Sequence, residues 1–140
     1  MFPRLSFAAN ADQFLLTAKQ KPISLQLKER RIVEFREMQT LGAGIIVRDD
    51  GNICVVFADW ADPQSRPQSL GHEIGHTFGL DLTYRIPKRI RQKHTPIQIV
   101  EEFCDKFAEC WLALHDKEKI RQLIESELRL KLELITSCNI

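Results

Sequence analysis

The chain has 140 residues and a formal net charge of +1, from 20 Lys and Arg residues against 19 Asp and Glu residues. This near-balance gives no strong field for nucleic acid or for an anionic membrane, so we expect neither as a direct partner. The length suits one hydrophobic core, so residues 1–140 are predicted to form a single domain. No uncharged apolar run approaches the ~18 residues that a membrane span needs.

The chain contains four cysteines: Cys54, Cys104, Cys110 and Cys138. They form no C-x-x-C pair, and free thiols of a cytoplasmic protein are the simplest interpretation. The apolar run near the N-terminus is too short for a secretory signal and is interrupted by Asn10. We therefore expect a cytoplasmic location.

The first 40 residues predict one helix and one segment of mixed character. Residues 11–20 place apolar side chains on one side of a short helix, which Pro22 ends. In residues 23–27 apolar side chains alternate as in a strand, whereas residues 27–38 are charged enough for an exposed helix. The sequence alone leaves this segment undecided.

The following segment predicts a hairpin. Residues 43–47 and 53–57 are rich in β-branched side chains, which favour strands. The Asp-Gly pair at residues 50–51 lies between them and is a strong signal for a tight antiparallel turn.

Three further helices are expected. The first begins after Ser65, a predicted N-cap, and ends at Gly79. Residues 96–115 and 117–134 are the others; the last is amphipathic and packs on the core, with a partner surface as the alternative. These elements predict an α+β fold with a short N-terminal helix, a small antiparallel sheet with a hairpin, two central helices and a C-terminal amphipathic helix.

A metal-binding pattern lies in the first of these three helices. Residues 72–76 read His-Glu-Ile-Gly-His, which is the H-E-x-x-H pattern. On a helix His72 and His76 are separated by only ~40° of rotation, so both rings can reach one cation. Glu73 lies ~100° from His72, which suits a general base that takes a proton from zinc-bound water. The pattern predicts one zinc ion, although so short a motif also arises by chance in ordinary helices.

A third protein ligand would distinguish a zinc site from a chance occurrence of the motif. One option for this ligand is the last residue of the pattern H-E-x-x-H-x-x-G-x-x-H or -D. Gly79 fits its turn, but the third-ligand position is then Leu82, and Asp81 lies one residue too early. This pattern also needs a methionine after the helix, and the only two methionines are Met1 and Met38. We therefore reject this option.

The other option is a glutamate from the helix predicted over residues 96–115. At ~100° per residue, Glu102 shares a face with Lys106 and is expected to be solvated. Glu101 lies on an edge with the small residue Ala108, where a carboxylate without a partner would be costly. Glu101 is therefore the predicted third ligand, in a His₂Glu site with one open position.

Asp105 lies one turn after Glu101, where it can accept the free ring N–H of a ligating histidine and fix its tautomer. The alternative for Asp105 is an ordinary surface carboxylate. The reaction also needs a donor for the oxyanion, and Tyr84 and His94 in the connection over residues 81–96 are candidates. A surface or packing role is the alternative for both.

Residues 72–76 (HEIGH) and 101–108 (EEFCDKFA) resemble the paired motifs H-E-[IL]-G-H and E-x-x-[AC]-[DN]-x-F-A of the ImmA/IrrE family of gluzincin-type metallopeptidases. With the hairpin, the resemblance covers roughly residues 43–115. It implies a small zincin-like domain. The roles that it implies are zinc ligation by His72, His76 and Glu101, general base catalysis by Glu73 and support of a histidine by Asp105.

The resemblance also implies an intracellular protease of limited specificity. Several members of the family cleave or inactivate helix-turn-helix repressors, so a protein or peptide substrate of this kind is the expected partner. The chain departs from the family at two places. Residues 111–114 read Trp-Leu-Ala-Leu in place of a Leu-Leu-Met-Pro-like ending, and residues 66–71 replace the usual Arg-x-x-Phe-x-x-Ala run.

Two functions are compatible with these residues. The first is a zinc-dependent metallo-endopeptidase, a hydrolase that acts on a protein substrate. The second is a non-catalytic, zinc-containing regulatory or sensing module that acts by protein–protein contact. Glu73 favours the first, because a structural zinc site has no use for an uncoordinated base and is usually closed by a fourth protein ligand.

Overall fold

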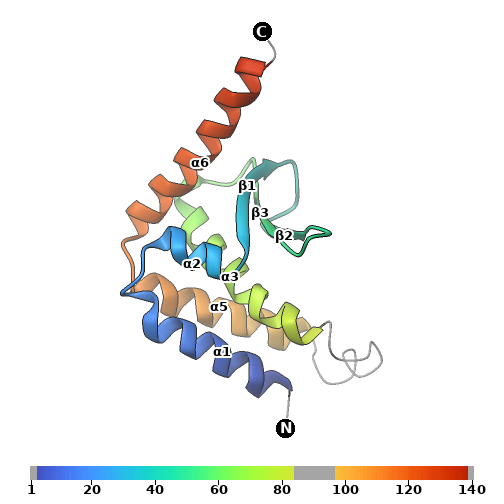
Figure 1. Cartoon of the computed structure of the whole chain (residues 1–140), viewed down its shortest axis with the longest axis vertical. Coiled ribbons are helices and arrows are strands. Elements are labelled where there is room, and N and C mark those ends of the chain that lie inside the picture. The colour runs from blue at the N-terminus through green and yellow to red at the C-terminus, as the bar shows by residue number, and fades with distance from the viewer. Residues whose placement is uncertain (1–2, 84–96, 139–140) are drawn as a thin grey trace.

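The computed structural model describes residues 3–83 and 97–138 and shows the expected mixed α+β architecture (Figure 1). None of the helices in these two stretches is both long and apolar enough to cross a bilayer. In chain order the elements are α1 (Pro3–Ala18), α2 (Ile23–Glu29), β1 (Ile32–Met38), β2 (Gly44–Val47), β3 (Ile53–Ala58), a 3-10 turn (Pro63–Ser65), α3 (Arg66–Thr83), α5 (Ile97–Ala113) and α6 (Lys117–Cys138).

The three strands form one sheet in the order β1-β3-β2. β2 and β3 pair antiparallel, with Ile45 opposite Val55, so the predicted hairpin is confirmed. Gly51 in its turn has a φ of 85°, which favours glycine. β1 pairs parallel to β3, so the prediction of a wholly antiparallel sheet is wrong. The hairpin signal fixes only how its own two strands pair, and the direction of β1 depends on packing with distant elements.

Residues 23–38, whose sequence pattern left a strand and a helix open, adopt the reverse of the order that the pattern suggested. The alternating residues form the helix α2, which begins after Pro22, and the charged residues form the strand β1. A register irregularity between Ile32 and Glu34 allows Ile32 and Phe35 both to be buried. Buried side chains three residues apart imitate the spacing of a helix, which hides this strand in the sequence.

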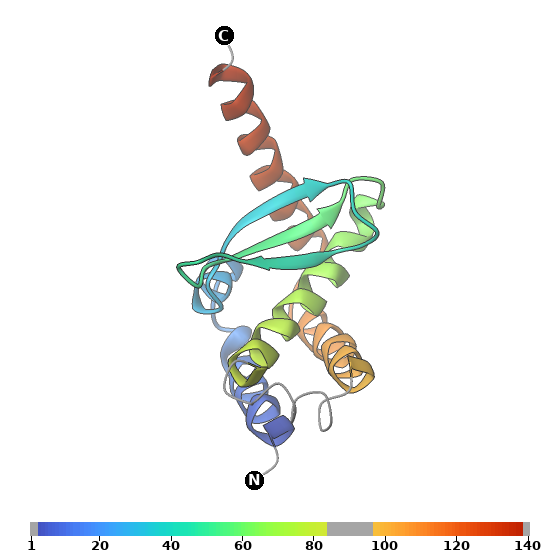
Figure 2. The ribbon, with the colours of Figure 1, turned by 90° about the vertical axis from the view of Figure 1, so that its right-hand side faces the viewer.

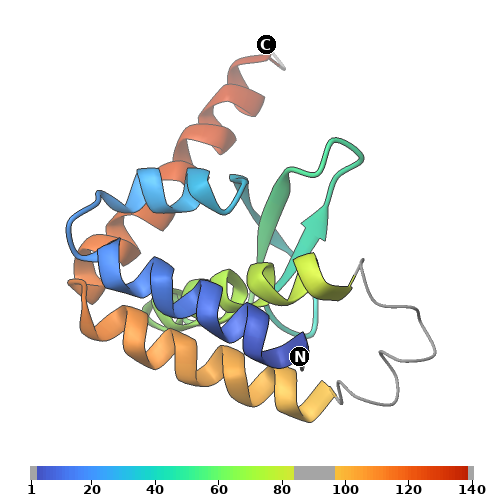
Figure 3. The same cartoon turned by 60° about the horizontal axis from the view of Figure 1, so that its bottom comes forward.

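The helix α3 is the central element of the fold. α1, α3 and α5 pack side by side (Figure 3), and the sheet, with all six residues of β3 buried, lies across α3 (Figure 2). The rings of Phe14 in α1, Phe78 in α3 and Phe107 in α5 contact one another, with centroids 5.5–6.0 Å apart. α3 is therefore fixed by helices and by the sheet.

A buried amide ties α2 to α1 and α5. Gln26 is fully buried, and its Nε2 donates to the carbonyl oxygens of Ala18 at 2.8 Å and Lys21 at 2.9 Å. Its Oε1 accepts a hydrogen bond from Trp111 Nε1 at 2.8 Å. Because both ends of the amide are paired, its burial carries little penalty and fixes the position of α2.

A buried guanidinium joins α3 to two other elements. Arg66 is the first residue of α3, and its Nη1 lies 2.7 Å from Oε1 of Glu125 in α6. Its Nη2 lies 2.9 Å from Oε2 of Glu37 in β1. Two carboxylates thus compensate one buried charge and hold the start of α3 against β1 and α6.

The central helix differs from its predicted form at both ends. The carboxylate of Asp62 accepts from the backbone N–H of Gln64 at 2.9 Å, and the Ser65 hydroxyl donates back to the Asp62 carbonyl at 2.6 Å. The cap is therefore Asp62, on the 3-10 turn before α3, and the predicted N-cap role of Ser65 is wrong. Gly79 does not end the helix, which continues to Thr83 with no positive φ at this glycine.

α3 and α5 approach each other closely because two glycines of α3 face α5. A Cβ on Gly71 would lie 3.0 Å from the Cα of Ala108, and a Cβ on Gly75 would lie 3.1 Å from the Cα of Cys104. Both distances are shorter than an ordinary van der Waals contact between carbon atoms. The glycines therefore bring side chains at the edge of α5 within reach of those on α3.

We expect Gly75→Ala to lower the free energy of unfolding by about 1–3 kcal/mol, because the added methyl group forces α5 away from α3. The matched control is Gly79→Ala in the same helix, where an added Cβ meets nothing within 4 Å. This control should raise the stability by up to about 1 kcal/mol, because alanine favours a helix over glycine. Chemical denaturation measures both, and equal stabilities of the two variants would contradict the close packing.

Candidate metal centre

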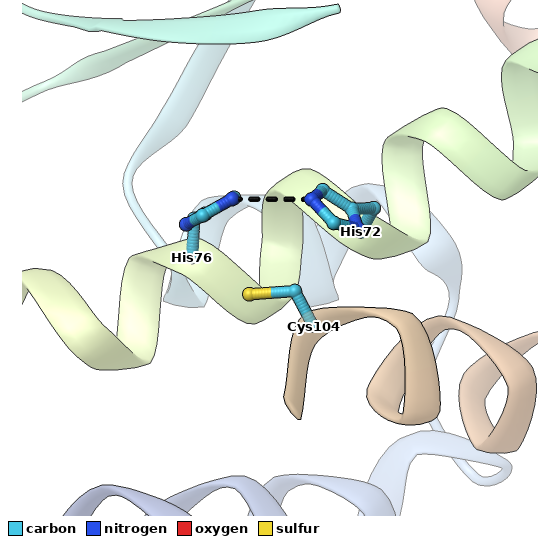
Figure 4. A group of neighbouring side chains, drawn as sticks. All are labelled: His72, His76 and Cys104. Carbon is cyan, nitrogen blue, oxygen red and sulfur yellow. Dashed lines mark hydrogen bonds between the residues drawn. The ribbon is translucent and has the colours of Figure 1, made fainter. Parts of the chain in front are cut away.

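The structure brings together the three predicted metal ligands. His72 and His76 lie one turn apart on α3, with Nε2 atoms 3.2 Å from each other (Figure 4). From α5, the Glu101 carboxylate places Oε2 2.8 Å from Nε2 of His72 and Oε1 3.1 Å from Nε2 of His76. Ligand atoms of three residues from two helices therefore converge on one point.

These distances fit the size of a zinc site. Zinc bonds of about 2.0–2.1 Å to nitrogen and oxygen, arranged as a tetrahedron, place neighbouring ligand atoms about 3.3–3.4 Å apart. The ligand-atom separations of 2.8, 3.1 and 3.2 Å need only a small expansion to reach that geometry. The imidazole and carboxylate donors are also of the type that zinc prefers.

The neighbouring glutamate has a different environment. Glu102 is exposed, whereas the side chain of Glu101 contacts both histidine rings. This difference agrees with the helical phasing that separates the two residues. The predicted oxyanion donors Tyr84 and His94 lie outside the described residues.

The two histidines are prepared to bind a cation in different ways. Burial lowers the pKa of His76 below its usual value, so its ring is neutral at pH 7 and keeps a nitrogen lone pair for a metal. Nδ1 of His72 lies 2.8 Å from Oδ1 of Asp105. When Nδ1 carries the proton and donates to this carboxylate, Nε2 of His72 is left as the acceptor that faces Glu101 and His76.

Glu73 lies beside these ligands in a pocket of about 300 Å³. The pocket is lined by Ala43, Gln68, Ser69, His72, Glu73 and Asp105. Glu73 is only 4% exposed, and this burial raises its pKa to about 7, against the ordinary 4.5. A carboxyl group with such a pKa can accept and release a proton near neutral pH.

In metal-free protein the Glu73 carboxyl should make stability depend on pH. Because its folded-state pKa is raised, its contribution is complete below about pH 4.5 and is lost as the pH rises through about 7. The lowered pKa of His76 changes the stability with pH in the opposite direction. The contribution of Glu73 is therefore isolated by comparing wild type with Glu73→Gln. Between pH 4.5 and 8 the free energy of unfolding of Glu73→Gln should rise by about 2–3 kcal/mol relative to that of wild type. Denaturation in the presence of a chelator measures this difference. A stability difference between the two proteins that stayed constant over this pH range would contradict a buried Glu73 carboxyl with a raised pKa.

One residue near the centre was not predicted as part of it. The side chain of Cys104 is fully buried, and its Sγ lies within 4.8 Å of a ring nitrogen of each histidine. Figure 4 shows it between α5 and the two rings. The sequence analysis missed Cys104 because cysteine spacing rules look for pairs of cysteines. Its position three residues after Glu101, on the same edge of α5, is the signal that could have found it.

The fold and the donor set together describe a candidate zinc centre between two helices of an α+β protein. Comparison with protein-family models, with curated proteins and with solved structures finds no match to this chain. Its function is therefore inferred from the chemistry of the residues at this centre.

Proposed function

We propose that the chain is a zinc-dependent metallo-endopeptidase of the ImmA/IrrE type, with a zincin-like fold and a cytoplasmic location. The observation that carries the proposal is the convergence of His72, His76 and Glu101 within 3.2 Å, with the buried carboxyl of Glu73 in the adjoining pocket. A zinc ion held by these three residues would lower the pKa of a water molecule and polarise the carbonyl of the scissile peptide bond.

Glu73 has the properties of the general base in this reaction. Its carboxylate takes a proton from the attacking water, and the resulting acid returns that proton to the departing amine. A pKa near 7 supports both transfers at neutral pH, and a bound cation shifts it towards the ionised form. Asp105 holds His72 in one orientation during these steps.

The sheet offers a place for an extended substrate. Within residues 3–83 and 97–138, β2 is an edge strand, because the strand order places β3 alone beside it. Ala43, just before β2, lines the pocket that contains Glu73, and Ile46 and Val47 in β2 are exposed. A peptide that adds to this edge in extended form would pass the candidate metal centre. Such binding suits a flexible segment of a protein, and we propose a helix-turn-helix repressor as the substrate.

The zinc content of the purified protein tests the proposal directly. We expect about one zinc ion per chain, because the described part of the chain brings three protein ligands together at His72, His76 and Glu101. Removal of the metal by a chelator should lower the thermal midpoint by several degrees, and zinc but not magnesium should restore it. A content below about half an equivalent, without uptake of added zinc, would contradict a metal centre.

The second candidate function is a non-catalytic zinc-containing module that regulates or senses through protein–protein contact. The observation that favours it is the buried thiol of Cys104, because four protein ligands are typical of structural sites. The buried Glu73 is unexplained by such a site. Hydrolysis that depends on Glu73 separates the two functions.

A further inference from the structure

Cys104 lies beside the candidate metal centre, unlike the two other cysteines whose side chains the structure describes. It forms a cluster with His72 and His76 in which one ligand atom from each residue lies within 4.8 Å of the others. Cys110, on the same helix, is exposed, and Cys54 lies buried in β3, where its thiol faces Glu34 at 3.9 Å. Only Cys104 therefore has its sulfur beside the histidine nitrogens among the cysteines whose side chains the structure describes.

The space for this sulfur is created by a glycine of α3. A Cβ on Gly75 would lie 3.3 Å from the Sγ of Cys104 and 3.1 Å from its Cα. Gly75 lies between the two histidines in the sequence, so the sulfur occupies the gap that the missing side chain leaves. Cys104 is held there with no exposed surface.

The remaining distance to a coordinated geometry is small. In a tetrahedral site with Zn–N bonds of about 2.0 Å and Zn–S bonds of about 2.3 Å, sulfur and nitrogen are about 3.5 Å apart. The observed separations among the sulfur and one nitrogen of each histidine are at most 4.8 Å, so a movement of about 1 Å of the sulfur and the rings would bring these three atoms to that geometry. A side-chain rotation and a small ring shift supply movements of this size.

We propose that Cys104 is a fourth protein ligand, and that in the resting protein its thiolate occupies the position left open by His72, His76 and Glu101. This inference rests on the proposed zinc centre. The site then has a closed state with four protein ligands and an open state in which the sulfur has withdrawn and the fourth position accepts water or substrate. A thiolate also makes the closed state select zinc and other thiophilic ions over magnesium and manganese.

Cobalt absorption spectroscopy on the full chain tests this assignment, because Co²⁺ replaces zinc in such sites and its spectrum reports the ligands. We expect visible bands of a tetrahedral cobalt ion and a near-ultraviolet band of thiolate-to-cobalt charge transfer. Cys104→Ser should lose the charge-transfer band, and its zinc affinity should fall at least about tenfold. Cys110→Ser and Cys54→Ser are the matched controls and should keep both.

The outcomes separate this inference from the proposed function. Cobalt binding with no charge-transfer band in wild type would overturn the role of Cys104 and leave the three-ligand centre intact. Failure to bind cobalt or zinc at all would overturn both. Because serine places a hydroxyl in a buried site, Cys104→Ala is the second variant, with circular dichroism as the check on folding. A charge-transfer band that persists in the folded Ala variant would also overturn the assignment.

Discussion

Glu73→Gln is expected to lower peptide hydrolysis by about a thousandfold and to leave the zinc content unchanged. The amide has nearly the same size as the carboxyl group but cannot accept a proton from water. Because Glu73 is buried beside the ligands and is not one of the three converging residues, the substitution removes the base without removing a ligand. The measurement is the rate of appearance of new amino termini from a protein substrate such as casein, or from a mixed peptide library.

Glu102→Gln provides the matched control for this experiment. It makes the same chemical change at an exposed position on α5 and should retain full activity. Zinc analysis and circular dichroism of both variants exclude loss of metal or fold as the cause. Undiminished hydrolysis by Glu73→Gln would assign the base to another group, and the absence of hydrolysis in zinc-loaded wild type would favour the non-catalytic module.

Loss of a predicted ligand should have the second large effect. We expect His76→Ala to bind zinc at least about a thousandfold more weakly, because it removes one of the three converging ligands. Glu101→Gln should bind zinc about a hundredfold more weakly, because a neutral amide replaces the anionic carboxylate. Glu102→Gln should stay within about twofold of wild type. Competition with a chromogenic chelator measures the zinc affinity of all three variants. Equal effects of the two glutamine substitutions would contradict the geometry in which Glu101, and not Glu102, contacts the histidines.

The parts of the structure that were predictable from the sequence depend on local geometry. The hairpin of β2 and β3 follows from its Asp-Gly turn, and the convergence of His72 and His76 follows from the helical period. The same period places Glu101 rather than Glu102 towards the histidines. The small residue Ala108 also lies where the neighbouring helix needs room.

The parts that were not predictable depend on distant partners. β1 contains an irregularity that disguises its alternation, and its parallel direction is set by packing against β3. The helix α2 depends on Gln26, a polar residue whose burial makes sense only once Ala18 and Trp111 are beside it. The position of Cys104 depends on the gap at Gly75, which becomes visible only when α3 and α5 are packed.

The ion pairs of Arg66 determine where the protein can be shortened or tagged. A C-terminal truncation that ends the chain before Ile120 would remove Glu125 and leave the buried guanidinium with Glu37 alone. It would also remove Ile120 and Ile124, which are fully buried in the core. α6 is therefore a part of the domain over its first turns and not a separable tail. Fusion partners and affinity tags belong beyond Glu125, where they leave the start of α3, and with it the helix that carries both histidines, undisturbed.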